Sequence, residues 1–418
     1  MSDRVIRPRR TVIGAALGLA VLAALACAER GEQSGGVGVP QRSEIDPPAR
    51  PGAFAVRLAA GADEILATWW EPLDAEVDEA GHRLLFARYT DAWSEPSVVV
   101  EGDDLFANWA DFPAVVREPS GDLLVTWLAK TGEETYAYSI YLGRSHDDGA
   151  TWRNLGKLND DVTDTEHGFV SLVPEGDAVR AFWLDGRRMV AGGPMTVRTA
   201  VVGASVGPSE LLDERVCECC PTDAVTTTEG ALVAYRDRSD EEVREISAVG
   251  RVGDGWSEPE RLTFDRWNIP GCPVNGPALD HRDGRTALAW YTGAEGAAHV
   301  GMRFLEGTPA EREPVVVDGE RPLGRVGVVL DRNGDAVVSW LALVGKQAEL
   351  RLRRVGTDGS LGAAVPIART SASRSSGMPQ LVRRGERFYL GWVEVPLEAP
   401  SRVRVSSIAP ELVPAIGD

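Results

Sequence analysis

The 418-residue sequence lacks the motifs of several common enzyme classes. It has no glycine-rich phosphate loop, no His-Glu-x-x-His pair and no Gly-x-Ser-x-Gly turn, so nothing in it supports nucleotide use, zinc hydrolysis or serine hydrolysis. It also shows almost no helical periodicity after residue 30, because its apolar runs are short and alternate with polar residues. The composition, 43% apolar and 26% charged, is ordinary for a soluble globular protein. We therefore expect an all-β fold.

The amino-terminal region has an apolar run that is too short and too rich in Gly and Ala for a convincing transmembrane helix. Residues 12–25 follow four arginines and end in Ala24-Leu25-Ala26-Cys27. Basic residues before a short apolar run are typical of a secretory signal peptide, here residues 1–26. Small residues before a cysteine resemble the processing site of bacterial lipoproteins, and this resemblance implies cleavage before Cys27 and attachment of lipid to it.

The lipoprotein interpretation implies an extracytoplasmic protein, in the periplasm or at the cell surface, that contacts the membrane through lipid on Cys27. Ala28, rather than Asp, follows that cysteine, and by resemblance to lipoprotein sorting rules this favours the outer membrane. An ordinary signal peptide is the alternative. Residues 27–52 are rich in Gly, Pro, Ser and charge and predict a flexible tether, which leaves residues 53–418 as one folded domain.

Acidic residues exceed basic ones, and the formal net charge is −19. Removal of residues 1–26 would take away four arginines and one aspartate and leave −22. Such a surface repels nucleic acid and anionic lipid headgroups, so both are excluded as expected partners.

An aromatic residue recurs at the same place in seven apolar β-type segments, at steps of 50 to 58 residues. A period of this length indicates a supersecondary unit that cannot bury its apolar face alone, so neighbouring units must stack into one core. We therefore predict a single domain of seven units. The recurring residues are Trp69, Trp127, Trp183, Tyr235, Trp290, Trp340 and Trp392.

The second unit shows the internal pattern of the repeat. Residues 112–158 contain four short alternating segments, which predict four antiparallel strands and thus one β-propeller blade. Between the third and fourth segments lies a Ser-x-Asp-x-Gly-x-Thr-Trp sequence. Its carboxylate can accept backbone N–H groups across a tight turn, its glycine supplies an unusual φ, and its tryptophan fills the gap between hairpins. These residues are Ser145, Asp147, Gly149, Thr151 and Trp152.

This sequence is an Asp box, and with weaker copies around Trp93, Trp256 and Asp358 it resembles the sialidase-like, or BNR-repeat, β-propeller superfamily. The resemblance implies an all-β ring of four-stranded blades. Seven units favour a seven-bladed propeller, and a six-bladed ring of the sialidase type is the alternative. Asp boxes serve structure in enzymes and in non-enzymatic propellers alike, so the resemblance specifies the fold more than the function.

In a propeller, the loops that lead into the innermost strands share a face with the loops between second and third strands. Ligands usually bind where the first set, here called the leading loops, converges on the axis. The leading loops carry Asn108, Asp111, His167, Cys217, Cys219, Cys220, Cys272, Asn275 and Arg325. The second set of loops adds Arg187, Arg188, Arg236 and Arg238.

The four cysteines other than Cys27 lie on two neighbouring leading loops, so we expect Cys272 to reach Cys219 or Cys220. In an oxidising compartment, an even number of cysteines favours one or two disulfides between blades four and five. A Cys-x-Cys-Cys sequence with a distant cysteine and His167 is also a soft ligand set suited to copper or zinc. A redox-active pair of adjacent cysteines is a third hypothesis, and His167 by itself favours a structural role.

The clustered arginines could hold a carboxylate or a sugar through bidentate hydrogen bonds, with Asn108, Asn275 and Arg325 completing the candidate ligand site. Pairing of Arg236 and Arg238 with nearby acidic residues is an equally open alternative.

The sialidase resemblance also implies a set of catalytic residues that can be sought in the sequence. Sialidases hold the substrate carboxylate with three arginines, use a tyrosine nucleophile activated by a glutamate and carry an Arg-Ile-Pro segment, which this chain lacks. Asp111 is the candidate acid, whereas Tyr235, Tyr291 and Tyr389 lie in or beside the repeated aromatic position and fit core packing better. We therefore favour a binding or scaffold module for a glycan, a carboxylate, a metal ion or an envelope protein. A glycoside hydrolase of the sialidase-like superfamily is the runner-up, and a copper- or zinc-binding protein is the third hypothesis.

Overall fold

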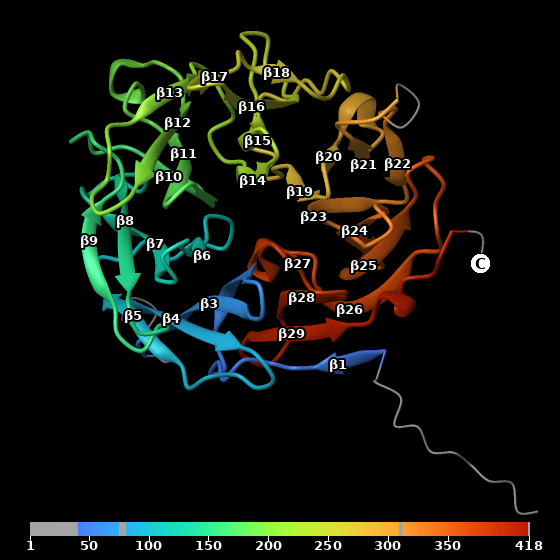
Figure 1. Ribbon diagram of the computed structural model, residues 1–418, viewed down its shortest axis with the longest axis horizontal. Helices are drawn as coiled ribbons and strands as arrows, with labels where there is room; N and C mark the ends of the chain where they lie inside the picture. The colour runs from blue at the N-terminus through green and yellow to red at the C-terminus, as the bar shows by residue number, and fades with distance from the viewer. Residues whose placement is uncertain (1–40, 75–80, 309–311, 417–418) are drawn as a thin grey trace, which may run out of the picture. The chain divides into compact units, whose positions relative to one another are not determined.

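The structure is a computed structural model that describes residues 41–74, 81–308 and 312–416. The expected signal peptide and Cys27 lie outside the described residues. Within them the chain forms seven antiparallel sheets, arranged as blades around an axis (Figure 1). The seven-bladed, all-β propeller that the aromatic repeat predicts is confirmed, and the six-bladed alternative is wrong.

Each blade begins with its innermost strand. Blade one comprises β2 (Phe54–Ala60), β3 (Ile65–Pro72), β4 (His82–Tyr89) and β5 (Ser97–Gly102). Blade two comprises β6 (Val115–Arg117), β7 (Leu123–Lys130), β8 (Tyr138–Ser145) and β9 (Arg153–Lys157). Blade three comprises β10 (His167–Glu175), β11 (Ala178–Asp185), β12 (Thr196–Val202) and β13 (Glu210–Asp213). Blade four comprises β14 (Asp223–Thr227), β15 (Gly230–Arg236) and β16 (Ile246–Val252), with β17 (Gly255–Trp256) and β18 (Glu260–Arg261) both paired to β16.

The remaining blades follow the same order. Blade five comprises β19 (Ala278–Arg282), β20 (Arg285–Thr292), β21 (His299–Phe304) and β22 (Val315–Asp318). Blade six comprises β23 (Pro322–Leu330), β24 (Ala336–Val344), β25 (Gln347–Val355) and β26 (Val365–Ser371). Blade seven comprises β27 (Gln380–Arg384), β28 (Arg387–Glu394), β29 (Arg402–Ile408) and β1 (Arg42–Glu44). The described helices are short 3-10 turns, η1 (Met189–Ala191), η2 (Ala294–Gly296), η3 (Arg374–Ser376) and η4 (Pro410–Leu412). Among the described residues, no helix has the length and apolarity needed to cross a membrane.

Blade seven is completed by the beginning of the described chain. Strand β1 pairs antiparallel with β29, with Ser43 opposite Ser407. The Asp46 carboxylate also accepts a hydrogen bond of 2.9 Å from the backbone N–H of Val405. The composition of residues 27–52 predicts a tether, but part of that segment is a strand, because the open edge of β29 offers N–H and C=O groups that a further strand satisfies. The folded unit therefore starts before residue 53.

The repeated aromatic residues form the centre of each blade. All seven are buried, and each lies on the second strand of its sheet. A buried indole N–H or phenol O–H needs an acceptor. Five of the seven donate to a carboxylate, namely Trp69 to Glu71 (3.0 Å), Trp183 to Asp185 (2.9 Å), Tyr235 to Asp213 (2.6 Å), Trp290 to Asp265 (2.8 Å) and Trp340 to Asp318 (2.6 Å).

Side-chain oxygens of the innermost strands, or of the loops that lead into them, also bond to the innermost strand of the next blade. In each case an acidic or amide side chain of one blade accepts a hydrogen bond from a backbone N–H of the next. The pairs are Asp111 with Phe169 (2.8 Å), Asp223 with Leu279 (2.7 Å), Asp280 with Leu330 (2.6 Å) and Asn275 with Arg325 (2.6 Å). These bonds satisfy backbone donors that the sheet itself leaves unpaired near the axis.

The Asp box has the geometry that its residue types suggest. Asp147 accepts hydrogen bonds from the Thr151 N–H (2.9 Å) and hydroxyl (2.6 Å). Ser145 accepts one from the Gly149 N–H at 2.8 Å. Gly149 has φ of +87°, and a Cβ there would clash with the ring of Phe86. Trp152 packs edge-on against Phe86, with ring centroids 5.1 Å apart.

We expect closure by β1 to contribute measurably to stability. Ile45, the residue after β1, donates its N–H to the Val405 carbonyl at 2.8 Å. Ile45→Pro removes that donor and leaves the residues of β1 and β29 unchanged. The free energy of unfolding in urea should fall by roughly 1–3 kcal/mol. Ile45→Val, which keeps the N–H, is the matched control. Equal midpoints for the two variants would show that β1 does not hold the ring closed.

Candidate functional site

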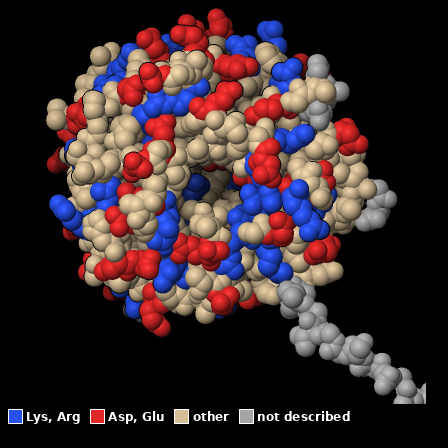
Figure 2. Space-filling model, viewed as in Figure 1, with Lys and Arg blue, Asp and Glu red and all other residues tan. Residues whose placement is uncertain are grey.

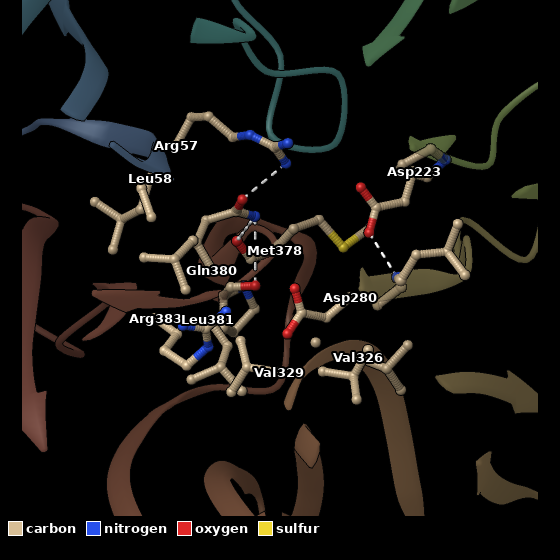
Figure 3. A pocket seen from close by; sticks show the side chains of 18 of the residues that line it. Arg57, Leu58, Asp223, Asp280, Val326, Val329, Met378, Gln380, Leu381 and Arg383 are labelled. Atoms are coloured by element: carbon tan, nitrogen blue, oxygen red, sulfur yellow. Dashed lines mark hydrogen bonds between the residues drawn. The ribbon is translucent and has the colours of Figure 1, made fainter. Parts of the chain in front are cut away.

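The innermost strands enclose an axial cavity of about 530 Å³, and Figure 2 shows the ring hollowed at its centre. This volume lies within the range of small-molecule sites. Blades one, four, five, six and seven supply most of the wall. Four polar side chains from different strands surround the same space in Figure 3, and we call them the polar ring: Arg57, Asp223, Asp280 and Gln380.

The polar ring contains both donors and acceptors. Arg57 donates from Nη1 to Gln380 Oε1 at 2.9 Å, whereas its Nε finds no hydrogen-bond partner among the described residues. Burial raises the pKa of Asp280 to about 6, helped by the nearby Asp223, although the Leu330 N–H and Arg383 oppose the shift. Burial also raises the pKa of Asp223, against the attraction of Arg57. The cavity therefore offers a guanidinium beside two carboxyl groups whose pKa values are raised by burial.

Three members of the polar ring occupy equivalent places in their blades. Arg57 pairs with Thr68, Asp223 with Ala234 and Gln380 with Gly391, and each of these partners immediately precedes a repeated aromatic residue. The search for a site among loops missed them because they belong to strands. Alignment of the units on the aromatic repeat would have shown a polar residue at this equivalent position in three first strands.

Most of the arginines expected to hold a ligand lie outside this cavity. In the part of the chain that the structure describes, Arg325 alone of the five lines it. Arg187 is committed to Asp185 and Asp160, at 2.7 Å from each. Arg188 lies 3.7 Å from Glu214 at the propeller surface.

The arginines of blade four are engaged in structural contacts. Arg236 is buried and donates to the backbone carbonyls of Asn275 (2.8 Å), Arg244 (2.9 Å) and Tyr291 (2.7 Å). Arg238 pairs with Glu242 at 2.6 Å and with Glu218. Hydrogen bonding of this kind leaves few donors free for a ligand, so the structural alternative fits these two residues best.

Arg325 lines the axial cavity. Its guanidinium stacks over Trp109, 5.3 Å from the ring centroid, and donates to Ser376 Oγ at 2.6 Å and the Gly377 carbonyl at 3.0 Å. Burial lowers its pKa to about 10. The Asn275 side chain accepts the Arg325 N–H and so positions this residue, whose φ of +55° is unusual for a side chain with a Cβ.

Asp111 is a blade-joining residue and does not line the axial cavity. One of its carboxylate oxygens accepts the Phe169 N–H, and a Cβ on Gly168 would clash with the other, which finds no hydrogen-bond partner in the described chain. Burial raises its pKa well above the usual value. The Asn108 side chain accepts a hydrogen bond from the Ala110 N–H at 2.8 Å and so closes the turn that precedes Asp111.

A tyrosine and a glutamate form a hydrogen-bonded pair near Asp111. Tyr138 donates its hydroxyl to Glu166 at 2.8 Å. Both groups are shifted toward their protonated forms, because burial raises the pKa of Tyr138 well above its usual value and that of Glu166 to about 7. A tyrosine whose pKa is raised is the opposite of an activated nucleophile.

His167 belongs to an ion network rather than to the cysteines. Its Nε2 lies 3.1 Å from Asp161 and 3.8 Å from Asp185, and its Nδ1 lies 2.9 Å from the Thr165 carbonyl. Burial lowers its pKa, but the two carboxylates raise it by more. Although the two carboxylates and the imidazole are close enough to share a metal ion, the Arg187 guanidinium already neutralises them, 2.7 Å from Asp185 and 3.5 Å from Asp161.

The four cysteines of the leading loops come together, and we call them the thiol cluster: Cys217, Cys219, Cys220 and Cys272. Cys217 Sγ lies 3.1 Å from Cys220 Sγ and 3.9 Å from Cys219 Sγ. Cys272 lies near the Cys219 thiol, which lowers the pKa of Cys272. All four are free thiols, so the disulfides that the cysteine count favours are absent from the described residues. Their sulfurs face one another beyond the S–S bond length of about 2.05 Å.

The thiol cluster has a cation beside it. Arg244 Nη1 lies 3.0 Å from Cys217 Sγ. The Cys219 and Cys220 thiols, followed by Arg244, hold the pKa of Cys217 well below its usual range. Cys217 is therefore the thiol placed to carry negative charge, whereas its neighbours and burial raise the pKa values of Cys219 and Cys220.

No protein-family model matches the chain, and neither does the sequence of any curated protein. Solved structures do match. A PL25 ulvan lyase, a polysaccharide lyase bound to a GlcA(1-4)Rha3S unit, gives a TM-score of 0.55 at 10% identity over 86% of this chain and 95% of that one. A protein of unknown function from Dyadobacter fermentans gives 0.50 at 10% identity over 88% and 99%. The NanB sialidase from Streptococcus pneumoniae gives 0.45 at 11% identity over 90% and 71%. At these identities the likeness to the first two structures establishes the fold alone, and the predicted β-propeller is confirmed.

Glu166 should make stability depend on pH. Its pKa of about 7 in the folded protein is above its ordinary value of 4.5, so the folded state holds a proton that the unfolded state has lost, and stability falls as pH rises between these values. Glu166→Gln keeps an acceptor for Tyr138 and removes the ionisation. At pH 8 the variant should be more stable than the wild type by on the order of 2 kcal/mol, and at pH 4.5 about equally stable. Urea denaturation across this pH range measures the free energy of unfolding of the wild type and of the variant. Glu134→Gln, on the exposed surface, is the control. Parallel curves for wild type and Glu166→Gln would contradict the assignment.

Proposed function

We propose that this protein is a binding module whose axial cavity takes a small polar ligand, a glycan fragment that carries a carboxylate. The observation that supports it is the polar ring inside a cavity of about 530 Å³. Arg57 places a guanidinium in the wall of the cavity, and charge-assisted hydrogen bonds from a guanidinium to a carboxylate are strong. Asp223, Asp280 and Gln380 supply acceptors and donors suited to sugar hydroxyls.

Arg325 is a second guanidinium of the cavity wall, and it is supported by an aromatic ring that does not itself line the cavity. The guanidiniums of Arg325 and Arg374 lie 5.3 and 5.8 Å from the ring centroid of Trp109. The ulvan lyase of similar fold is bound to a glycan containing glucuronate, which agrees with this choice of ligand.

Binding without turnover fits the charged groups better than sialidase chemistry does. All five candidate arginines are held in ion pairs or by backbone carbonyls, and the Tyr138–Glu166 pair is shifted toward its neutral forms. A glycoside hydrolase is the second candidate, on one specific observation. Asp280 has a pKa of about 6 and shares the cavity with Asp223, as a general acid and its partner carboxylate would.

The proposal includes a membrane anchor. The sequence ending in Cys27 supports attachment of lipid to that cysteine, which would hold the propeller outside the cytoplasm, at the outer membrane. A ligand from the cell envelope or its surroundings would then reach the cavity directly.

Isothermal titration with a panel of neutral and uronate-containing oligosaccharides tests the ligand proposal. We expect a uronate-containing member to bind, and Arg57→Gln to weaken it by roughly 10–100-fold, because a hydrogen bond to a charged group contributes about 1.5–3 kcal/mol. Arg153→Gln, on the exposed outer strand β9, is the matched control and should bind as the wild type does. Binding by none of the panel, or equal binding by Arg57→Gln, would exclude the proposal. Release of reducing ends that disappears in Asp280→Asn would instead establish the hydrolase.

Attachment of lipid to Cys27 is tested separately. Cys27→Ser should leave the protein without lipid, so that it partitions into the aqueous phase of a detergent separation while the wild type enters the detergent phase. Mass spectrometry of the wild-type amino terminus should show diacylglycerol on Cys27. A wild type without lipid would favour the ordinary signal peptide.

A further inference from the structure

The thiol cluster lies where two leading loops meet, outside the polar ring. Three of its sulfur atoms lie within 4.8 Å of one another, and two of the separations are 3.1 and 3.9 Å. Thiolates bound at about 2.3 Å to one tetrahedral ion are about 3.8 Å apart. The sulfurs thus stand at the spacing of ligands to one ion, and small side-chain rotations complete the fit.

The surroundings of the cluster also suit a thiolate site. Bound thiolates leave excess negative charge, and second-sphere donors stabilise it. Arg244 donates to Cys217 Sγ and is itself fixed by Glu242 at 2.8 Å and by the Ile269 carbonyl at 3.2 Å. A buried cysteine that merely fills space has no need of a guanidinium on its sulfur.

The cluster is both anchored and accessible. Cys217 and Cys220 are buried, and the Cys217 N–H bonds to the Arg236 carbonyl at 3.0 Å, which fixes the base of the loop. Cys219 is half-buried and Cys272 is exposed. An ion can therefore enter from the face of the propeller and find two preplaced sulfurs below it.

We propose that the thiol cluster binds one thiophilic d10 metal ion, Zn(II) or Cu(I), with sulfur ligands from blades four and five. All of the sulfur donors are soft, and such sets select these two ions over the hard cations that prefer oxygen. The ion joins the two blades at the face, as a disulfide would, but reversibly. This site is independent of the ligand proposed for the axial cavity.

Metal binding is measured on the full-length protein, purified without metal under anaerobic, reducing conditions. We expect one equivalent of Zn(II) or Cu(I), each added separately against a chromophoric competitor, to bind with release of protons from the thiols. Cobalt(II) should give the intense visible absorption of thiolate coordination. Competition between the two ions then identifies the one that the site prefers.

Variants test the ligand set. Cys219→Ser and the exposed Cys272→Ser should each weaken binding, by at least about 100-fold for Cys219→Ser. Cys27→Ser is the same chemical change outside the cluster and should bind as the wild type does, and so should Arg57→Gln in the axial cavity. Circular dichroism and the thermal midpoint report whether each variant is folded.

Two results would overturn the proposal. One is an isolated protein whose cluster is joined by disulfides in peptide mass spectra and which, after reduction, binds neither ion. The other is a cluster of four free thiols that binds neither ion when it is added, or metal binding that Cys219→Ser and Cys272→Ser leave unaffected. Failure of glycan binding at the axial cavity changes neither outcome.

Discussion

A buried aromatic residue on the second strand of each blade is the contact on which the propeller depends. A four-stranded sheet exposes two apolar faces, and each is covered only when the next blade packs against it. The aromatic ring fills that interface, and its polar N–H or O–H must find an acceptor there. Glu71, Asp185, Asp213, Asp265 and Asp318 provide one in five blades. The same interaction therefore fixes core packing and brings carboxylates toward the face of the leading loops.

The hydrogen bonds within the fold then determine which polar side chains remain available to bind a ligand. Asp111, Asp223 and Asp280 look equivalent, since each accepts a backbone N–H from the next blade. They differ in what surrounds the rest of the carboxyl group: Asp223 and Asp280 also line the axial cavity, whereas Asp111 does not. The arginines sort in the same way, because Arg236 is fully engaged by backbone carbonyls and Arg57 is not.

The face of the leading loops thus combines two kinds of chemistry. The axial cavity carries oxygen and nitrogen groups, and the thiol cluster beside it carries sulfur. Cys219 and Trp109 pack against the same hydrophobic core around Phe169 and Met378, so the two sites share their support. Their polar groups remain separate, and each site can be altered without removing the donors of the other.

Much of the fold could be predicted from the sequence, because every blade of a propeller repeats the same pattern of strands and buried residues. The aromatic position recurs in every unit, and the bonds of Asp147 and Ser145 that close the Asp-box turn join residues within that turn. Strand β1 could not be predicted in this way, since a three-residue segment has no periodicity and its partner β29 lies at the other end of the chain. The site was predicted only in part. The meeting of the cysteines followed from neighbouring loops, but Arg57, Asp223, Asp280 and Gln380 were overlooked.

The sequence by itself determined the period, the number of blades, the Asp box and the gathering of cysteines on one face, because these depend on contacts within a unit or between adjacent units. Only the tertiary structure decided which charged groups are satisfied. Distances of a few ångströms decide that Arg187 binds Asp185 rather than a ligand. They also decide that His167 contacts Asp161 rather than the cysteines. Those distances set the electrostatic energies, and spacing along the chain does not fix them.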